Sequence, residues 1–185
     1  MDAELRPATS TDAIAVAGLW TEAYVTRGVS GRSEPYSAAD FERSLREGEV
    51  HVAENEGSVV GVVVLRGPSA PGRAVAGEGE AELSRLAVSI GHRGGGIGRA
   101  LAELCRERAR RAGWPAIALW SRPGQVEAHR LYESLGYRRL PERDTIDASG
   151  RPRVVFRLVL PRGPAAVPYP SIGRIRNSDR ATGRG

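Results

Sequence analysis

The sequence predicts a mixed α/β domain, and three observations support this fold class. Strand-like segments alternate with segments whose apolar residues recur at helical spacing. A glycine-rich turn, residues 93–100 (RGGGIGRA), separates a strand-like segment from a helical one. Residues 116–120 (AIALW) are apolar throughout, which is typical of a strand covered on both faces. The length of 185 residues and the 41% hydrophobic content suit one globular domain.

The first half of the chain predicts three strands and two helices. Pro7 ends the first strand, and the polar residues 9–12 can cap a helix. The apolar residues of this helix recur at helical spacing: Ile14, Leu19, Trp20 and Tyr24. The expected elements are a strand over residues 3–6, helices beginning near residues 9 and 37, strands over residues 50–54 and 58–65 around a hairpin turn, and a loop over residues 67–79.

The second half predicts two more helices among four strands. The first of these helices has the apolar stripe Ile97, Leu101, Leu104 and Cys105, and the second has Ala128, Leu131, Tyr132 and Leu135. The expected elements are strands over residues 82–89 and 116–120, helices over residues 97–112 and 125–135, and a closing pair of strands over residues 137–140 and 154–160. The predicted order is therefore β-α-α-β-β-β-α-β-α-β-β in one mixed sheet.

The positive charge is concentrated at the end of the chain. The net charge is +5, and residues 161–185 contain five arginines and one aspartate, which leaves +1 for the rest. We therefore expect one domain over residues 1–160, followed by a flexible tail over residues 161–185. Because the body is nearly neutral and only 5% of residues are aromatic, nucleic-acid binding is disfavoured.

Cysteine and histidine content predicts neither a disulfide framework nor a metal site. Cys105 is the single cysteine, and His51, His92 and His129 lack the spacing of metal ligands. We expect Cys105 in the core and His129 on the surface. There is no apolar run near the ~20 residues of a membrane span, and residues 1–4 do not begin a signal peptide. The expectation is a cytoplasmic protein.

The glycine-rich turn predicts a phosphate-binding site. A turn that leads from a strand into a helix presents backbone N–H groups at the positive end of the helix dipole. The dinucleotide fingerprint G-x-G-x-x-G fails here, because its third glycine position is occupied by Arg99 or Leu101. The chain contains no lysine, which excludes a Walker loop and a pyridoxal phosphate Schiff base.

Two motifs resemble the GCN5-related N-acetyltransferase (GNAT) family. The first is Arg93-x-x-Gly96-x-Gly98, which follows a strand. The second is Gln125-x-x-Ala128-x-x-x-Tyr132-x-x-x-Gly136-Tyr137, where relatives usually have asparagine first and often phenylalanine last. The order of elements also agrees, and the resemblance covers about residues 5–160. It implies an acyl-CoA N-acyltransferase fold with acetyl-CoA as cosubstrate and no metal.

The resemblance also implies which residues hold the cosubstrate. The amides of residues 94–100 would bind the pyrophosphate, with Arg93 and Arg99 adding charge, and the strand before the turn would pair with the pantetheine arm. Gln125 would contact that arm or the end of a strand, although its side chain is one methylene longer than asparagine. The expected cofactor-binding residues are Leu86, Ala87, Val88, Arg93, Gly94, Gly95, Gly96, Ile97, Gly98, Arg99, Ala100 and Gln125.

The same resemblance implies the catalytic residues. Tyr132 would be the general acid that protonates the departing thiolate; the alternative is a core tyrosine. Glu82 would deprotonate the acceptor amine through water. The alternative is that Glu82 is one of several solvated acidic residues at the start of the strand. Strand alternation places Glu82, Ser84, Leu86 and Val88 on one face. A backbone N–H of residues 86–88 would stabilise the developing oxyanion.

The expected function is transfer of an acetyl group from acetyl-CoA to a primary amine of a small molecule or peptide. The amine would attack directly in a ternary complex. The alternative is a non-catalytic acyl-CoA-binding module that regulates a partner. No motif names the amine acceptor, which would lie against residues 27–49, the loop after Trp120 and the closing hairpin. Relatives often dimerise, so a homodimer is compatible with the resemblance, and no sequence marker indicates one.

Overall fold

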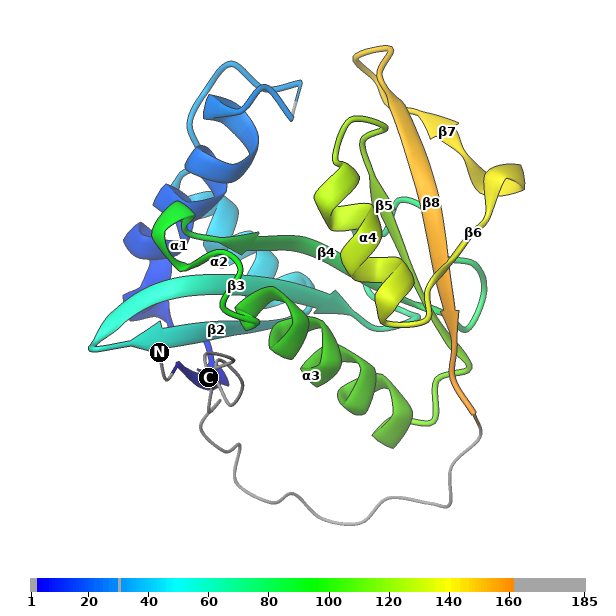
Figure 1. The fold of residues 1–185 in the computed structure, drawn as a ribbon, viewed down its shortest axis with the longest axis horizontal. Coiled ribbons are helices and arrows are strands. Elements are labelled where there is room, and N and C mark those ends of the chain that lie inside the picture. Colours follow the sequence, from blue (N-terminus) through cyan, green and yellow to red (C-terminus); the bar gives the residue numbers. More distant parts are fainter. Residues whose placement is uncertain (1–2, 30, 162–185) are drawn as a thin grey trace, which may run out of the picture.

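The computed structural model describes residues 3–29 and 31–161, so the predicted tail from residue 162 onward lies outside the described residues. An eight-stranded mixed sheet has the order β1-β2-β3-β4-β5-β8-β6, and β7 pairs with β8 (Figure 1). The strands are β1 (Glu4–Pro7), β2 (Glu49–Asn55), β3 (Ser58–Arg66), β4 (Ala81–Val88), β5 (Ala116–Ser121), β6 (Arg138–Arg139), β7 (Thr145–Ile146) and β8 (Pro152–Val159).

The main helices are α1 (Ala13–Trp20), α2 (Ala38–Glu47), α3 (Ile97–Arg111) and α4 (Val126–Ser134). Four short helical segments join them: η1 (Ser10–Asp12), η2 (Thr21–Thr26), η3 (Ile90–His92) and η4 (Pro141–Arg143). The predicted mixed α/β fold and the order of its main elements are confirmed. The two-residue strand β7, in the loop expected between the closing strands, was not predicted.

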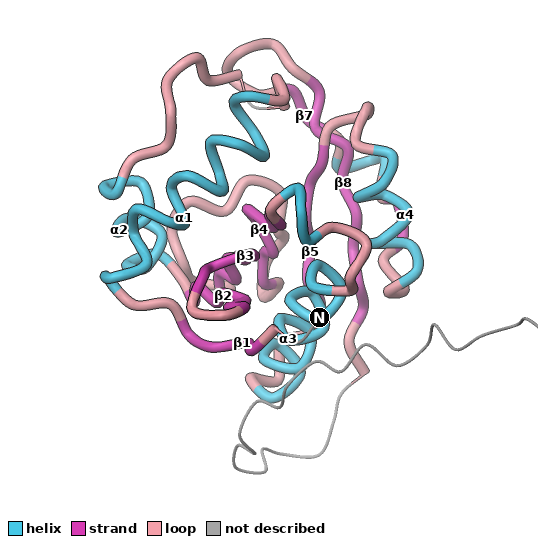
Figure 2. The backbone as a smooth tube through the Cα atoms, turned by 60° about the vertical axis from the view of Figure 1, so that its left-hand side comes forward, coloured by secondary structure: helices cyan, strands magenta, loops and turns pink. Residues whose placement is uncertain are grey.

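Helices cover the sheet on both faces. Figure 2 shows α1 and α2 on one side of the strands, with α3 and α4 on the other. Alternating residues of β3 supply both cores: Val62 and Val64 pack with Trp20 and Phe41, whereas Val63 packs with Leu101. The apolar runs in the sequence are explained by this two-sided burial. None of the helices among the described residues has the length and apolarity needed to cross a membrane.

One apolar residue of the first helix is exposed, and the expectation that His129 lies on the surface is wrong. Ile14 is 85% exposed, because α1 (AIAVAGLW) is apolar on nearly every side and its buried face is formed by other residues, including Val16 and Trp20. His129 is half-buried and its ring lies 5.0 Å from that of Phe156, so it does not point outward. Cys105 lies in the core as expected, where burial raises the pKa of its thiol.

A β-bulge interrupts β4. In the antiparallel pairing with β3, Val62 is opposite Ala87 and Val64 is opposite Ser84, so Val63 faces two residues, Arg85 and Leu86. Arg85 has φ of 52°, in the left-handed region. The bulge reverses the alternation of side chains after Ser84.

The expectation that Glu82, Ser84, Leu86 and Val88 share one face is therefore wrong. Ser84 lies opposite Val64 on the α1/α2 face, and Glu82 lies on that face too. Leu86 and Val88 pack on the α3/α4 face, against the core that contains Tyr132. No glycine in β4 marks the bulge in the sequence.

The sheet splits between β4 and β5. The two strands run parallel and pair only at Ala81–Ile117 and Glu82–Ala118, while β5 pairs along its whole length with β8. Beyond Glu82, β4 therefore has an edge inside the sheet. Its carbonyl groups accept hydrogen bonds from side chains: Trp20 Nε1 to Arg85 O (3.2 Å), Tyr24 OH to Leu86 O (2.7 Å) and Arg93 Nε to Val88 O (3.0 Å).

Candidate functional site

The glycine-rich turn has open backbone N–H groups. Gly94 and Gly96 have φ of 76° and 84°, and α3 begins directly after Gly96. The first hydrogen bond of the helix joins Ala100 N to Gly96 O at 3.0 Å. Within the described part of the chain, the N–H groups of residues 94–99 make no hydrogen bond. Ala100 differs from the expectation, because its N–H is already used inside the helix.

The space in front of this turn is also open. A Cβ atom added to Gly94 or Gly96 would have no heavy atom within 4 Å. A row of free N–H groups facing open space at the positive end of a 15-residue helix fits a pyrophosphate group. The turn therefore has the donors and the room that the predicted cosubstrate requires.

The two arginines of the turn differ in their surroundings. Arg93 donates to Val88 O and lies 3.9 Å from the Glu22 carboxylate, so it braces the open edge of β4 against the turn. Arg99 is more exposed, with its Nη2 2.7 Å from Ser134 Oγ and an ion pair to Glu103. Of the two, Arg99 has the freer side chain at the start of α3.

Tyr132 projects from α4 into the core beside the split in the sheet. It is 7% exposed, and its ring lies 5.8 Å from that of Tyr137 and 6.0 Å from that of Phe156. Burial raises the pKa of its phenol, so the hydroxyl is protonated at neutral pH. This hydroxyl makes no hydrogen bond with any described residue, which leaves its proton available to a ligand. Its role as general acid stays a prediction.

Glu82 is an anchor for the loop that precedes β4. The residue is 1% exposed, and its Oε2 accepts the N–H groups of Ala74 (2.8 Å), Val75 (2.8 Å) and Ala76 (3.1 Å). It also lies where β4 still pairs with β5, before the gap opens. These surroundings give no support to Glu82 as the base. Glu80 has a similar anchoring role, since it binds Gly77 N and two arginines.

Gln125 holds the end of β5. Its Oε1 accepts hydrogen bonds from Ser121 Oγ (3.0 Å) and Arg122 N (2.9 Å). Of the two contacts that the resemblance implies, the structure contains the one to the strand end. The longer side chain of glutamine is therefore accommodated by the turn before α4, and its amide N–H groups point to no acceptor among the described residues.

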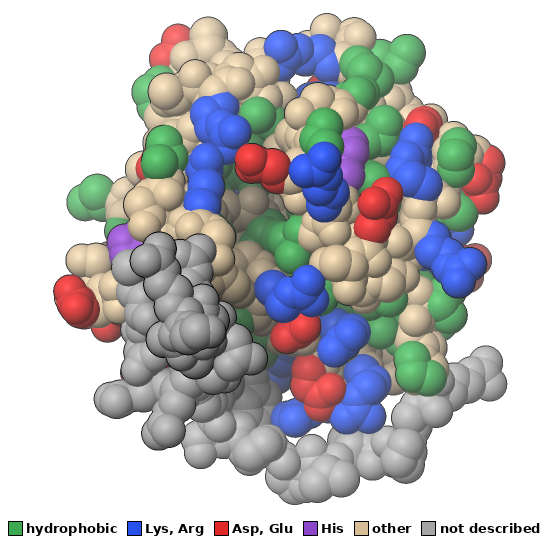
Figure 3. Space-filling view, in the orientation of Figure 1, with side chains coloured by type: hydrophobic (Ala, Val, Ile, Leu, Met, Phe, Trp, Pro, Cys, Tyr) green, Lys and Arg blue, Asp and Glu red, His purple; other side chains and the backbone are tan. Residues whose placement is uncertain are grey.

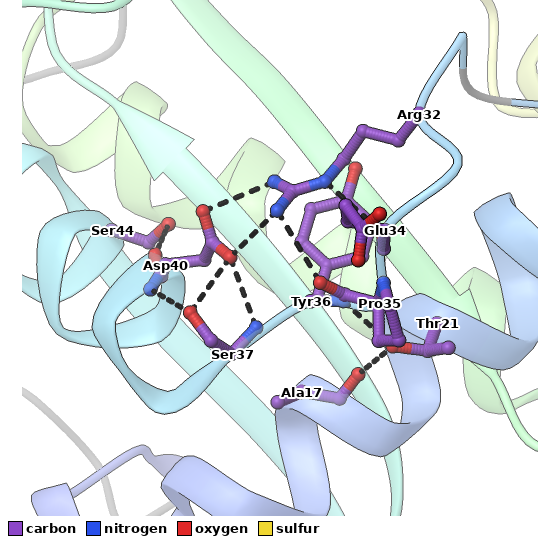
Figure 4. Close-up of polar contacts among 9 residues, drawn as sticks. All are labelled: Ala17, Thr21, Arg32, Glu34, Pro35, Tyr36, Ser37, Asp40 and Ser44. Atoms are coloured by element: carbon purple, nitrogen blue, oxygen red, sulfur yellow. Dashed lines mark hydrogen bonds and ion pairs between the residues drawn. The ribbon is translucent and has the colours of Figure 1, made fainter.

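The segment before α2 is fixed by a network of polar contacts (Figure 4). Arg32 forms an ion pair with Asp40 at 3.1 Å, and the backbone N–H and the hydroxyl of Ser37, the N-cap residue of α2, donate to the same carboxylate. Burial opposes the charge of Asp40, but hydrogen bonds from Ser37 and Arg32 lower its pKa to about 2. Thr21 Oγ1 accepts the N–H of Tyr36 at 2.9 Å. The network holds the Tyr36 ring beside the Trp20 ring, with their centroids 5.7 Å apart.

Aromatic rings surround a cation on the β4 bulge. The Arg85 guanidinium carbon lies 4.6 Å from the Trp20 ring and 5.2 Å from the Tyr36 ring. On β5, across the gap, the centre of the Trp120 ring lies 4.9 Å from the guanidinium carbon of Arg122 and 4.8 Å from that of Arg153. The sequence placed Tyr36 and Arg122 only within the broad segments expected beside the acceptor. It did not indicate Arg85, because these residues match no motif and meet only in the fold.

A hollow separates the segment after η2 from the start of α4. Its volume is ≈ 640 Å³, and it is lined by residues 27–29 on one side and residues 124–128 on the other. Arg122 closes its floor with hydrogen bonds to Val29 O, Arg151 O and Pro152 O. Figure 3 shows the surface hollowed between the two halves of the molecule, with basic side chains beside the opening. The gap in the sheet is thus reached from this face.

The comparisons with known proteins identify the family. The model described as the acetyltransferase (GNAT) family matches residues 15–137, which is more than half of the chain. The chain therefore belongs to the GNAT family, whose members are acetyl-CoA-dependent N-acetyltransferases. The resemblance drawn from the two motifs is confirmed.

Solved structures share the fold. A GCN5-related N-acetyltransferase from Kribbella flavida has a TM-score of 0.68 and 26% identity, over 85% of this chain and 98% of that one. A putative acetyltransferase from Salmonella typhimurium, solved with its cofactor acetyl-CoA, has a TM-score of 0.66 and 22% identity, over 90% of this chain and 98% of that one.

A curated relative matches over a shorter stretch. N-acetylaspartate synthetase from Xenopus tropicalis is 37% identical over 87 residues, which are 47% of this chain and 30% of the relative. The chain thus spans less than a third of the length of this relative. The match supports the family, and the acceptor has to be argued from the site itself.

Proposed function

We propose that this protein transfers an acetyl group from acetyl-CoA to a primary amine of a small molecule or peptide, by direct attack in a ternary complex. One observation carries the proposal: the open N–H groups of residues 94–99 lie directly after the unpaired edge of β4. A phosphate-binding turn next to a free strand edge suits acetyl-CoA, because its pyrophosphate can bind the turn while its amide-containing arm pairs with the strand.

Bound acetyl-CoA supplies the thioester carbon that the amine attacks. The turn binds the pyrophosphate, and the backbone of residues 86–88 pairs with the pantetheine arm in the gap. A free N–H on this edge stabilises the oxygen as it gains charge. The new C–N bond forms as the C–S bond breaks, and Tyr132 donates its proton to the leaving thiolate. The nitrogen, which is positively charged once the C–N bond has formed, loses a proton to water as the amide forms, and the phenol recovers a proton from solvent.

The amine must also lose a proton, because a free alkylamine has a pKa near ~10. Glu82 is enclosed by three backbone N–H groups, so we propose that water in the gap carries this proton to solvent. The other finer expectations, a cytoplasmic location and a homodimer, stay predictions.

Calorimetry with purified protein tests the cosubstrate. Acetyl-CoA and free CoA should bind, whereas ATP and NAD should not. Gly96→Val should weaken acetyl-CoA binding by about tenfold or more, because its side chain enters the open space in front of the turn and the N–H row is displaced.

Gly57→Val is the matched control. Gly57 has φ of 76° and an equally open Cβ position, but it lies in the β2–β3 hairpin. Both variants strain a left-handed residue by about 1–2 kcal/mol. Only Gly96→Val should lose binding. Equal binding by the two variants would show that the pyrophosphate site is misplaced.

The second candidate is a non-catalytic acyl-CoA-binding module. The free hydroxyl of Tyr132 beside the gap favours the enzyme, because a binding module has no need of a proton donor there. Release of CoA thiol in the presence of an amine panel decides between them. Tight acetyl-CoA binding without thiol release from any amine would support the module.

A further inference from the structure

Among residues 3–29 and 31–161, no acidic side chain pairs with the cation Arg85. Other arginines form ion pairs: the buried Arg66 with Glu47, the half-buried Arg122 with Asp147, and the exposed Arg32 with Asp40. The Arg85 side chain forms neither an ion pair nor a hydrogen bond with any residue that the structure describes. Its Nη1 is buried and has no hydrogen-bond partner. Burial lowers the pKa of this guanidinium, as expected for a charge in a partly desolvated site.

The nearby carboxylates are committed elsewhere. Asp40 accepts hydrogen bonds from Arg32 and Ser37, and Glu47 is held by Arg66. The rings of Trp20 and Tyr36 stabilise the cation through their π faces, but they cannot accept its in-plane N–H groups. An arginine fixed in this way is oriented and still has donors free. This is the state expected of a guanidinium that binds an anionic ligand in its plane.

Arg85 also lies at the proposed reaction site. Glu82–Ala118 is the last pair before the gap, and Arg85 and Trp120 follow it by three and two residues on the two strands that border the gap. Ala118 and Val155 form a small apolar cluster against which Trp120 packs. Arg153, two residues before Val155, stacks on the Trp120 ring, and its Nε is buried without a hydrogen-bond partner. Two incompletely bonded guanidinium groups therefore line the same face of the split sheet.

We propose that the acceptor amine carries a carboxylate, which Arg85 binds on the β4 side of the gap while Arg153 provides a second cationic contact on the β8 side. This inference rests on the proposed acetyltransferase function. A carboxylate supplies the missing countercharge and accepts two parallel N–H bonds from the free edge of a guanidinium. With its carboxylate held there, the acceptor presents its amino group to the gap.

Acceptor pairs that differ only in one carboxylate test the inference. We would measure kcat/KM for glycine against glycinamide and for aspartate against asparagine. The wild-type protein should prefer the acid in at least one pair by about tenfold to a hundredfold. Arg85→Gln should remove this preference by lowering kcat/KM for the acid and leaving that for the amide unchanged. Arg85→Lys should restore part of it.

Arg43→Gln is the control for the loss of one positive charge. Arg43 is exposed on α2 and has no part in the site. Arg43→Gln should leave the ratio of kcat/KM for the acid to kcat/KM for the amide unchanged. Arg153→Gln should reduce this ratio less than Arg85→Gln does. Equal use of acids and amides by the wild type would overturn the inference. So would an equal loss of both in Arg85→Gln, since Arg85 would then serve only to hold Trp20 and Tyr36.

A binding experiment separates this inference from the proposed chemistry. Succinate contains two carboxylates and no amine, so its calorimetric binding to the CoA-saturated protein does not need turnover. Binding to the wild type that is lost in Arg85→Gln would support the inference even if no amine is acetylated. Failure of succinate and of carboxylate-containing amines to bind the wild type would overturn it, whatever the fate of the acetyltransferase proposal.

Discussion

Replacing Glu82 by glutamine separates an anchoring role from a catalytic one. The carboxylate accepts three backbone N–H groups while 1% exposed. A hydrogen bond to a charged group contributes about 1.5–3 kcal/mol, and one to a neutral group about 0.5–1.5 kcal/mol. Glutamine keeps an acceptor oxygen, so each of the three bonds loses about 1 kcal/mol. The variant should therefore be destabilised by about 3 kcal/mol.

This loss corresponds to a fall in melting temperature of about 6–12 °C for a chain of this size. The assay is thermal unfolding followed by circular dichroism, with Glu78→Gln, an exposed neighbour in the same loop, as control. At a temperature where both variants are folded, kcat and its pH profile should match the wild type. A stable Glu82→Gln protein with kcat reduced a hundredfold would refute the reasoning and restore Glu82 as the base.

Two further predictions concern the acid and the segment before α2. Tyr132→Phe should lower kcat by about 10²–10⁴-fold while acetyl-CoA affinity measured by calorimetry stays the same, and unchanged kcat would exclude Tyr132 as general acid. The lowered pKa of Asp40, about 2 against an ordinary 3.8, means that its pairing stabilises the fold above about pH 4 and that this stability is lost as pH falls towards 2. The amount is about 2 kcal/mol, so urea unfolding of Asp40→Asn should vary less between these pH values than that of the wild type, and parallel curves would contradict the assignment.

The sequence predicted the parts of the site that depend on local spacing. The glycines of the turn need only a strand before them and a helix after them, and both could be read from the pattern. Tyr132 was placed inward because it shares a helical face with Leu135. Periodicity conveys such positions directly, since no distant segment has to be known.

The surroundings of Glu82 and Arg85 could not be predicted in this way. The anchoring of Glu82 depends on a loop of irregular backbone, whose N–H directions are not encoded in residue type. The bulge at Arg85 has no glycine to mark it. It places every later side chain of β4 on the opposite face of the sheet from the one that simple alternation predicts. The two rings beside Arg85 belong to Trp20 and Tyr36, which are 16 positions apart and far from Arg85 in the sequence. Their contact with Arg85 therefore depends on the tertiary fold.

The split between β4 and β5 makes the sheet a pair of half-sheets joined at one end. Within the described part of the chain, β4 and β5 pair only at Ala81–Ile117 and Glu82–Ala118, so we expect a small rotation about this junction to change the width of the gap without breaking the ladders on either side. An extended molecule in the gap would act as the missing strand and couple the unfolding of the two halves. Ligand occupancy and mechanical rigidity should therefore rise together in this protein.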